Sequence, residues 1–240
     1  MNLYADSTYP VDDTHAALHR DELRSLAHPG TWGTAAERTA IAAESRRARC
    51  EAGLQESVGD EALADGAELP AAARDLARRV ALGGMSVDRD FFEQVRGAGI
   101  GAGAYVEIVG VVARLAHLDV FARGIGVSSR PLAAPTETRA PRRERPHEAC
   151  DEGFFVPSIP AAPAGGAVAE SIYGKGPAAN ILRSLSLVPD EARRLNRILD
   201  TEYFSMASIF DLTYSSLEGV SRPQIELVAA RVSALNQCFY

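Results

Sequence analysis

The chain has 240 residues, of which 46% are hydrophobic and 24% charged, and this is the composition of an ordinary globular protein. Such a composition excludes a collagen, a fully disordered chain and a disulfide-rich mini-protein. The net charge of −7 argues against a nucleic-acid partner, because binding to a phosphate backbone depends on an excess of Lys and Arg.

The sequence also contains indications of the cellular compartment of the protein. Cys50, Cys150 and Cys238 lie far apart, and acidic residues stand near the N-terminus where a signal peptide has basic and then apolar ones. The longest apolar stretch, 100–112, contains Glu107 and is shorter than the roughly 20 residues that span a bilayer. We therefore expect a cytoplasmic protein that does not cross a membrane.

Sequence patterns typical of helices begin in the first third of the chain. Thr34 and Glu37 have the spacing of a capping box, which predicts a helix running to about Arg49. The Ala-, Leu- and Arg-rich segment 71–82 predicts another helix, with Pro70 in its first turn, where a missing N–H costs nothing.

Further helices are expected after the glycine-rich connection at 97–103, at Pro189, and at Ser221, where Gln224 completes a second capping box. No stretch alternates with period two over the length of a strand, so we expect an all-α protein. The helix that follows 97–103 is indicated by apolar residues at helical spacing, namely Val106, Val109, Ala113, Ala116 and Val120.

Residues 131–166 are rich in proline, which indicates a linker. We predict an N-terminal helical region with a first repeat at 1–130, a Pro/Arg-rich linker at 131–166, and a second repeat at 167–240. A solvated linker is the favoured interpretation, although its arginines could bind a phosphate or an acidic partner. These arginines are Arg139, Arg142, Arg143 and Arg145.

The two halves show internal similarity. Shifting the sequence by 119 residues aligns 70–121 with 189–240 without a gap and gives nine identities in 52 positions. About 4 would be expected from this composition by chance. We interpret the match as the duplication of a helical unit, in which Glu107 is paired with Glu226 and Asp119 with Cys238.

The C-terminal segment holds the residues best suited to chemistry. Glu226 lies near the edge of the apolar stripe of the helix that follows Ser221, and Asn236 suits its C-terminus. We expect Cys238 to begin another helix. Thiols at helix N-termini ionise readily, and the thiolate is the nucleophile. An inert thiol and a surface carboxylate remain the alternatives for Cys238 and Glu226.

This segment resembles the alkylhydroperoxidase D and carboxymuconolactone decarboxylase superfamily. In its thiol-peroxidase branch, a Glu precedes the first Cys of a C-x-x-C pair by twelve residues, and a His follows the second Cys. Glu226 and Cys238 have this spacing, and 180–189 is similar to the segment that precedes the motif. The resemblance covers the second half well and the first half weakly, chiefly at 105–112 and 121–123.

The resemblance places the second Cys, or a selenocysteine, at position 241. We therefore expect a longer protein that is truncated here; a Cys codon changed to a stop or a shortened chain would leave the same end. In the intact site, the second chalcogen would attack a hydroperoxide and Cys238 would resolve the product. Glu226 would relay protons and an external dithiol would restore the thiols.

The first repeat has no such thiol, because Asp119 replaces it. We expect this repeat to be structural. Glu107 would be a buried or interfacial carboxylate that needs a partner, with Arg114 or His117 as candidates.

Other sites are less favoured. Cys50 lacks a second Cys at C-x-x-C spacing and is interpreted as a packed or exposed cysteine with no role in catalysis. His15 and His19 are four residues apart but have no third ligand at a diagnostic spacing, so no metal is expected. The glycines of 97–103 follow no predicted strand, which argues against a dinucleotide site. No cofactor is expected.

Three functions therefore compete. The favoured one is a thiol- or selenol-dependent hydroperoxide reductase, incomplete as given, with a hydroperoxide substrate and a dithiol reductant. The alternatives are a carboxymuconolactone decarboxylase-like lyase and a non-catalytic helical oligomerisation module. The resemblance implies a homo-oligomer. It also implies that Val232, Leu235 and Phe239 are left exposed in the truncated chain, which would promote aggregation.

Overall fold

The computed structural model describes residues 2–136, 139–176, 178–205, 208–209, 211–215 and 218–238. Within these residues, every regular element is a helix, and the extended backbone pairs only at an isolated bridge between Cys150 and Ser158. The all-α prediction is confirmed. The elements are α1 (Asp13–Leu26), α2 (Ala35–Glu51), η1 (Glu61–Asp65), α3 (Ala71–Leu82), η2 (Gly84–Ser86), α4 (Arg89–Gly97), α5 (Ala102–Gly124), α6 (Gly166–Tyr173), α7 (Asn180–Arg183), α8 (Pro189–Glu202) and α9 (Arg222–Leu235).

The chain forms two compact units, Met1–Asn196 and Arg197–Tyr240, and the boundary falls within α8. We call them the first and the second unit. Among the described residues, no single helix is long and apolar enough to cross a membrane by itself, and only α4 and α5 pass such a test together, as a pair bent by 120°.

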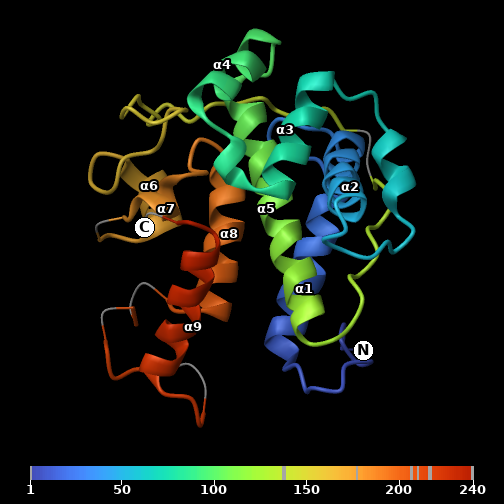
Figure 1. Ribbon diagram of the computed structural model, residues 1–240. Coiled ribbons are helices and arrows are strands. Elements are labelled where there is room, and N and C mark those ends of the chain that lie inside the picture. Colours follow the sequence, from blue (N-terminus) through green and yellow to red (C-terminus); the bar gives the residue numbers. More distant parts are fainter. Residues whose placement is uncertain are drawn as a thin grey trace. The chain divides into compact units, whose positions relative to one another are not determined.

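Helix α5 is the central helix of the first unit, and α1, α2 and α3 pack against it (Figure 1). It is apolar on most sides, as expected of a helix that is covered from several directions. Val111, Leu115 and Leu118 are at most 3% exposed, whereas Val120 is 55% exposed. The predicted helix is therefore confirmed, but its most buried side chains include residues outside the predicted stripe.

Local signals set the helix boundaries closely. The N–H of Glu37 donates to Thr34 Oγ1 at 3.2 Å and the N–H of Thr34 donates to Glu37 Oε2 at 2.7 Å, which is the predicted capping box of α2. Pro70 caps α3 from just outside its first turn. At the start of α9, the N–H of Ser221 donates to Gln224 Oε1 at 2.8 Å.

The segment 131–166 packs on the first unit, and the unit boundary lies thirty residues beyond it. The N–H of Leu132 donates to Asp60 Oδ2 at 3.0 Å, and that of Thr136 to the carbonyl of Ala27 at 3.0 Å. The side chain of Ile159 is fully buried. Buried apolar side chains and satisfied backbone groups hold this segment in place, despite its proline content.

The 119-residue repeat stays a prediction. It aligns α3 with nearly the whole of α8, and the first part of α5 with α9. The counterparts of α4 are residues 208–216, of which the described ones form turns or irregular backbone.

Candidate functional site

Glu226 lies on the first turns of α9 in a polar cluster of the second unit. Its carboxylate accepts hydrogen bonds from Tyr203 Oη at 2.8 Å and from Arg222 Nε at 2.6 Å. The hydrogen bond from Tyr203, followed by that from Arg222, holds the pKa of Glu226 below its ordinary value. The carboxylate is therefore ionised at neutral pH.

Arg222 joins this cluster to the loop before α9. Its guanidinium lies 4.0 Å from the centre of the Phe204 ring and donates to the carbonyl of Ile209 at 2.8 Å. Only 6% of Arg222 is exposed. The contacts of Glu226 are therefore also structural, because they hold the one buried residue of α9 in place.

Cys238 follows the C-terminal end of α9, and its thiol is free and exposed. Gln237 has a φ of 52°, its N–H donates to the carbonyl of Ala234, and that of Cys238 donates to the carbonyl of Ser233. This is the Schellman pattern, which ends a helix. Carbonyl groups point outward here, so α9 does not provide the field that activates thiols at helix N-termini. The helix that we expected to begin at Cys238 falls mostly outside the described residues.

The structure does not bring Glu226 and Cys238 together. Glu226 and Leu235 are nine positions apart on α9, which corresponds to about 13.5 Å along the helix axis at 1.5 Å per residue. Direct proton transfer between the two side chains needs hydrogen-bonding distance. A relay from Glu226 to this thiol therefore requires an intervening group.

In the first unit, Glu107 on α5 is buried, with 3% of the residue exposed. It accepts hydrogen bonds from the backbone N–H groups of Trp32 at 2.7 Å and Gly33 at 3.1 Å, and from Arg38 Nη1 at 2.7 Å. The prediction of a buried carboxylate with a partner is confirmed. The predicted partners, Arg114 and His117, were wrong, because the side chain that pairs with Glu107 is that of Arg38 on α2.

Arg114 instead pairs with carboxylates from two other helices. Its Nη2 donates to Glu191 Oε2 of α8 at 2.8 Å, and its Nη1 donates to Glu22 Oε2 of α1 at 2.5 Å. Arg38 Nη1 also donates to Glu191 Oε1 at 2.8 Å. We call this buried set, Glu22, Arg38, Glu107, Arg114 and Glu191, the central ion cluster.

The central ion cluster fixes the ionisation of Glu191. Burial by itself raises the pKa of this carboxyl group, but the charges of Arg114 and Arg38 outweigh it and hold the pKa below its ordinary value. The carboxylates and guanidinium groups of the cluster bond to one another, to nearby backbone N–H groups, and to the side chains of Ser25 and Arg194. We therefore assign the cluster to stability.

Asp119, the residue paired with Cys238 in the predicted repeat, belongs to a second buried set. Arg46 Nε donates to Asp119 Oδ2 at 2.9 Å and Arg46 Nη2 donates to Asp119 Oδ1 at 2.6 Å. Asp60 also accepts from Arg46. This bidentate pair joins α2 to α5 and supports the structural role that we predicted for the first repeat.

Cys50 is a poor candidate nucleophile. Its thiol is partly buried near the end of α2 and donates to Glu61 Oε1 at 3.5 Å. Burial, together with that hydrogen bond, raises the pKa of the thiol. The field of neighbouring carboxylates thus favours the unreactive thiol form.

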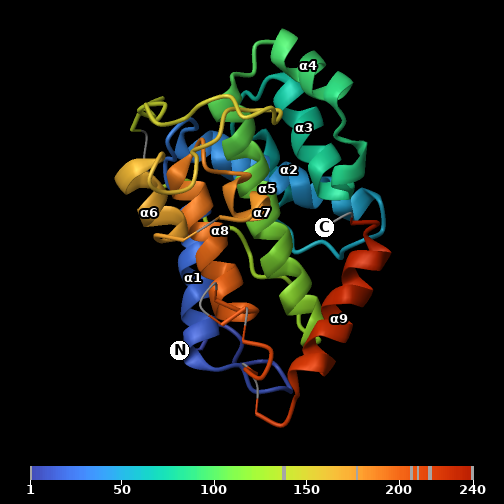
Figure 2. The same ribbon diagram turned by 90° about the vertical axis from the view of Figure 1, so that its left-hand side faces the viewer.

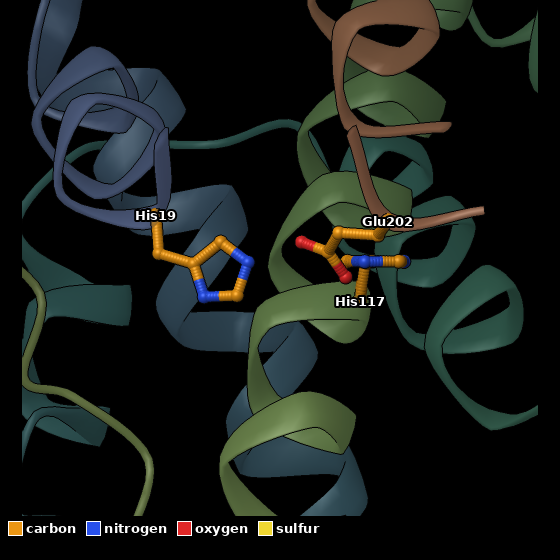
Figure 3. Close-up of side chains that lie close together, drawn as sticks. All are labelled: His19, His117 and Glu202. Atoms are coloured by element: carbon orange, nitrogen blue, oxygen red, sulfur yellow. The ribbon is translucent and has the colours of Figure 1, made fainter. Parts of the chain in front are cut away.

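The two histidines of α1 have separate surroundings. His15 pairs with Asp12 at the N-terminus of α1, whereas His19 is fully buried and its Nδ1 lies 2.7 Å from Tyr4 Oη. Figure 3 shows His19 on α1 and His117 on the neighbouring α5, and their ring centres are 6.5 Å apart. The structure therefore does not pair His15 and His19 as two ligands of one ion.

Sequence reasoning missed the buried arginines Arg38 and Arg46, and it named Arg114 with the wrong partner. Two signals could have indicated them. Arg114 and Asp119 are charged residues within a predominantly apolar helix, and Arg38 and Arg46 are eight residues apart in an alanine-rich one. Charged residues in such surroundings are rarely buried without a partner.

Comparisons of the chain with protein-family models, with curated proteins and with solved structures find no match. The resemblance stated from the sequence therefore stays a prediction.

Proposed function

We propose that this chain belongs to a thiol- or selenol-dependent hydroperoxide reductase and that Cys238 is its resolving thiol. The observation that carries the proposal is the free, exposed thiol of Cys238, twelve residues after a carboxylate that its neighbours keep ionised. The two exposed cysteines differ in this respect, since Cys150 lies in the 131–166 segment at an isolated backbone bridge.

The chemistry needs a second thiol or selenol as the attacking group. That group attacks the distal peroxide oxygen, the O–O bond breaks, and the alcohol leaves with a proton. Cys238 then attacks the resulting sulfenic or selenenic acid, water leaves, and a disulfide or selenenyl sulfide forms. A dithiol reduces this bond and supplies two protons and two electrons. Glu226 is proposed as the proton acceptor, acting through an intervening group.

The proposal is tested with the chain extended by one cysteine after Tyr240, which creates a C-x-x-C pair. Cumene hydroperoxide should produce a disulfide of Cys238, seen by mass spectrometry as the loss of two hydrogens from the C-terminal peptide. Dithiothreitol should then sustain turnover. We expect Cys238→Ser to abolish the disulfide and to reduce turnover at least tenfold, whereas Cys150→Ser should change neither.

Turnover that is unchanged by Cys238→Ser would rule out the resolving role. A peroxide-treated extended chain that forms no disulfide at Cys238 would eliminate the proposal as a whole.

A second candidate function, a helical assembly module, is favoured by the apolar surface of α9. Exposed fractions are 51% for Val232 and 63% for Leu235, as predicted, while Phe239 lies outside the described residues. Leu227 and Val228 are exposed as well, by 71% and 65%. Exposed apolar side chains in such a cluster commonly mark an interaction site.

We expect the 240-residue chain to sediment as an oligomer and Val228→Glu to shift it toward the monomer. Ala230→Glu is the matched control, because it adds the same charge to an exposed position about 200° around the same helix. Sedimentation velocity measures both. A monomeric wild-type chain would contradict assembly through α9 and leave the redox experiment as the deciding one.

A further inference from the structure

A cavity of about 240 Å³ lies in the first unit between α5, α7 and the segment 154–158. Both helices can be followed in Figure 2. Its walls are mainly apolar and include Val106, Val109, Phe154, Phe155 and Leu185. An apolar cavity of about 150 Å³ is large enough for benzene, so this one has room for a single ring with a small substituent.

Tyr105 supplies the polar feature of this cavity. The residue is only 6% exposed, and its ring packs edge-to-face on Phe92 with centres 5.1 Å apart. Burial raises the pKa of its hydroxyl, which therefore remains a donor. Within the described residues, this hydroxyl has no hydrogen-bond partner, although its residue lines the cavity.

The other buried tyrosines of the first unit differ. The hydroxyl of Tyr4 lies 2.7 Å from His19 Nδ1, and that of Tyr173 donates to the carbonyl of Ile159 at 3.0 Å. Buried tyrosine hydroxyls usually find a partner. The hydroxyl oxygen of Tyr105 has no partner among the described residues and is not among the fully buried polar atoms, so a ligand or a water molecule can reach it.

Arg183 of α7 adds a positively charged side chain at the wall. Its Nη2 pairs with Glu152, and its guanidinium lies 5.6 Å from the centre of the Phe154 ring. Its Nε is buried and has no partner among the described residues. The ion pair holds the segment that carries the two phenylalanines and places the positive charge of Arg183 at the wall of the cavity.

Two phenylalanines form the aromatic part of the wall. Phe155 stacks on Phe92 with ring centres 5.3 Å apart and an angle of 21° between the planes. Phe154 and Phe155 are 41% and 37% exposed, which gives the cavity access to solvent. Aromatic faces favour a planar apolar ligand, and the hydroxyl donor of Tyr105 favours an acceptor group on it.

We propose that this cavity binds a small monocyclic aromatic carboxylate, with the carboxylate accepting a hydrogen bond from Tyr105 Oη and the ring packed against Phe154 and Phe155. The carboxylate is selected because it accepts hydrogen bonds and carries a negative charge, which the hydroxyl of Tyr105 and the nearby guanidinium of Arg183 both favour.

The test uses the 240-residue chain and 4-fluorobenzoate, observed by ¹⁹F NMR. We expect saturable binding to the wild type and about tenfold weaker binding to Tyr105→Phe, which removes only the hydroxyl. Val109→Trp should fill the cavity and abolish binding. Tyr9→Phe is the matched control, since Tyr9 is 64% exposed, and it should bind like the wild type. Circular dichroism melting curves establish that each variant is folded.

Two further outcomes decide the proposal. 4-Fluorotoluene, which lacks the acceptor, should bind more weakly than 4-fluorobenzoate and with equal affinity to the wild type and Tyr105→Phe. Absence of 4-fluorobenzoate binding by the wild type, or binding unaffected by both Tyr105→Phe and Val109→Trp, would overturn the proposal. Loss of binding in Val109→Trp alone would overturn the role of Tyr105.

Discussion

Glu191→Gln is expected to lower the free energy of unfolding of the first unit by about 3 kcal/mol at pH 7. The carboxylate of Glu191 is the acceptor that Arg38 and Arg114 share, and all three residues are at most 3% exposed. The glutamine keeps the shape of the side chain but removes its charge. Two guanidinium groups then remain buried with only Glu107 and Glu22 to compensate them.

The effect of Glu191→Gln should depend on pH. The pKa of Glu191 is lower in the folded protein than in the unfolded chain, so its contribution is fully present above the unfolded value of about 4.3. It is lost as the pH falls through the lower, folded pKa. The wild type and the variant should therefore differ most near neutral pH and converge in acid.

Urea unfolding followed by tryptophan fluorescence measures this effect, because Trp32 is the single tryptophan and lies in the first unit. Asp190→Asn is the matched control. It changes the neighbouring carboxylate, which is 68% exposed and pairs with the exposed Arg193, so a cost below about 1 kcal/mol is expected. Equal losses in the two variants at pH 7 would contradict the role of the central ion cluster.

Asp119→Asn should destabilise the first unit by about 3 kcal/mol. The carboxylate of Asp119 accepts two hydrogen bonds from Arg46, which is fully buried. An asparagine would turn its NH₂ group toward one of these N–H donors and would leave Arg46 with the carboxylate of Asp60 alone. Both changes leave buried donors or charge without an acceptor.

The fluorescence of Trp32 again reports unfolding. Asp75→Asn serves as the control, because Asp75 is 47% exposed and lies 3.5 Å from Arg79 in an exposed pair. We expect its effect to stay below about 1 kcal/mol. A change of less than 0.5 kcal/mol in Asp119→Asn, on the order of a surface substitution, would show that the pair does not stabilise α2 against α5.

Gly110 illustrates a packing requirement that no sequence pattern indicated. A Cβ atom at this position would lie 2.6 Å from Glu191 Oε2 and 3.0 Å from Glu191 Cβ. The missing side chain therefore lets α8 approach α5 closely enough for Glu191 to reach Arg114. The sequence predicts a connection at 97–103, and Gly99, with a φ of 91°, lies between the end of α4 at Gly97 and the start of α5 at Ala102.

Much of the secondary structure was already present in the amino-acid sequence. The capping box of Thr34 and Glu37, the helix after Pro70 and the start of α8 at Pro189 are short-range features, and the structure confirms each. They depend on neighbouring residues along one turn of helix, so a pattern can indicate them without knowledge of the fold.

Only the tertiary structure decided which charged groups meet. Arg38 and Glu107 are 69 residues apart in the sequence, and Arg46 and Asp119 are 73 apart. Helical periodicity predicts which face a residue occupies, but it contains no information on which helix covers that face. The predicted partners of Glu107 lay on its own helix, whereas the packing of α2 against α5 brought Arg38 to it. The position of Tyr105 at a cavity could likewise be recognised only from the tertiary structure, because α7 and the segment 154–158 form the other walls of that cavity.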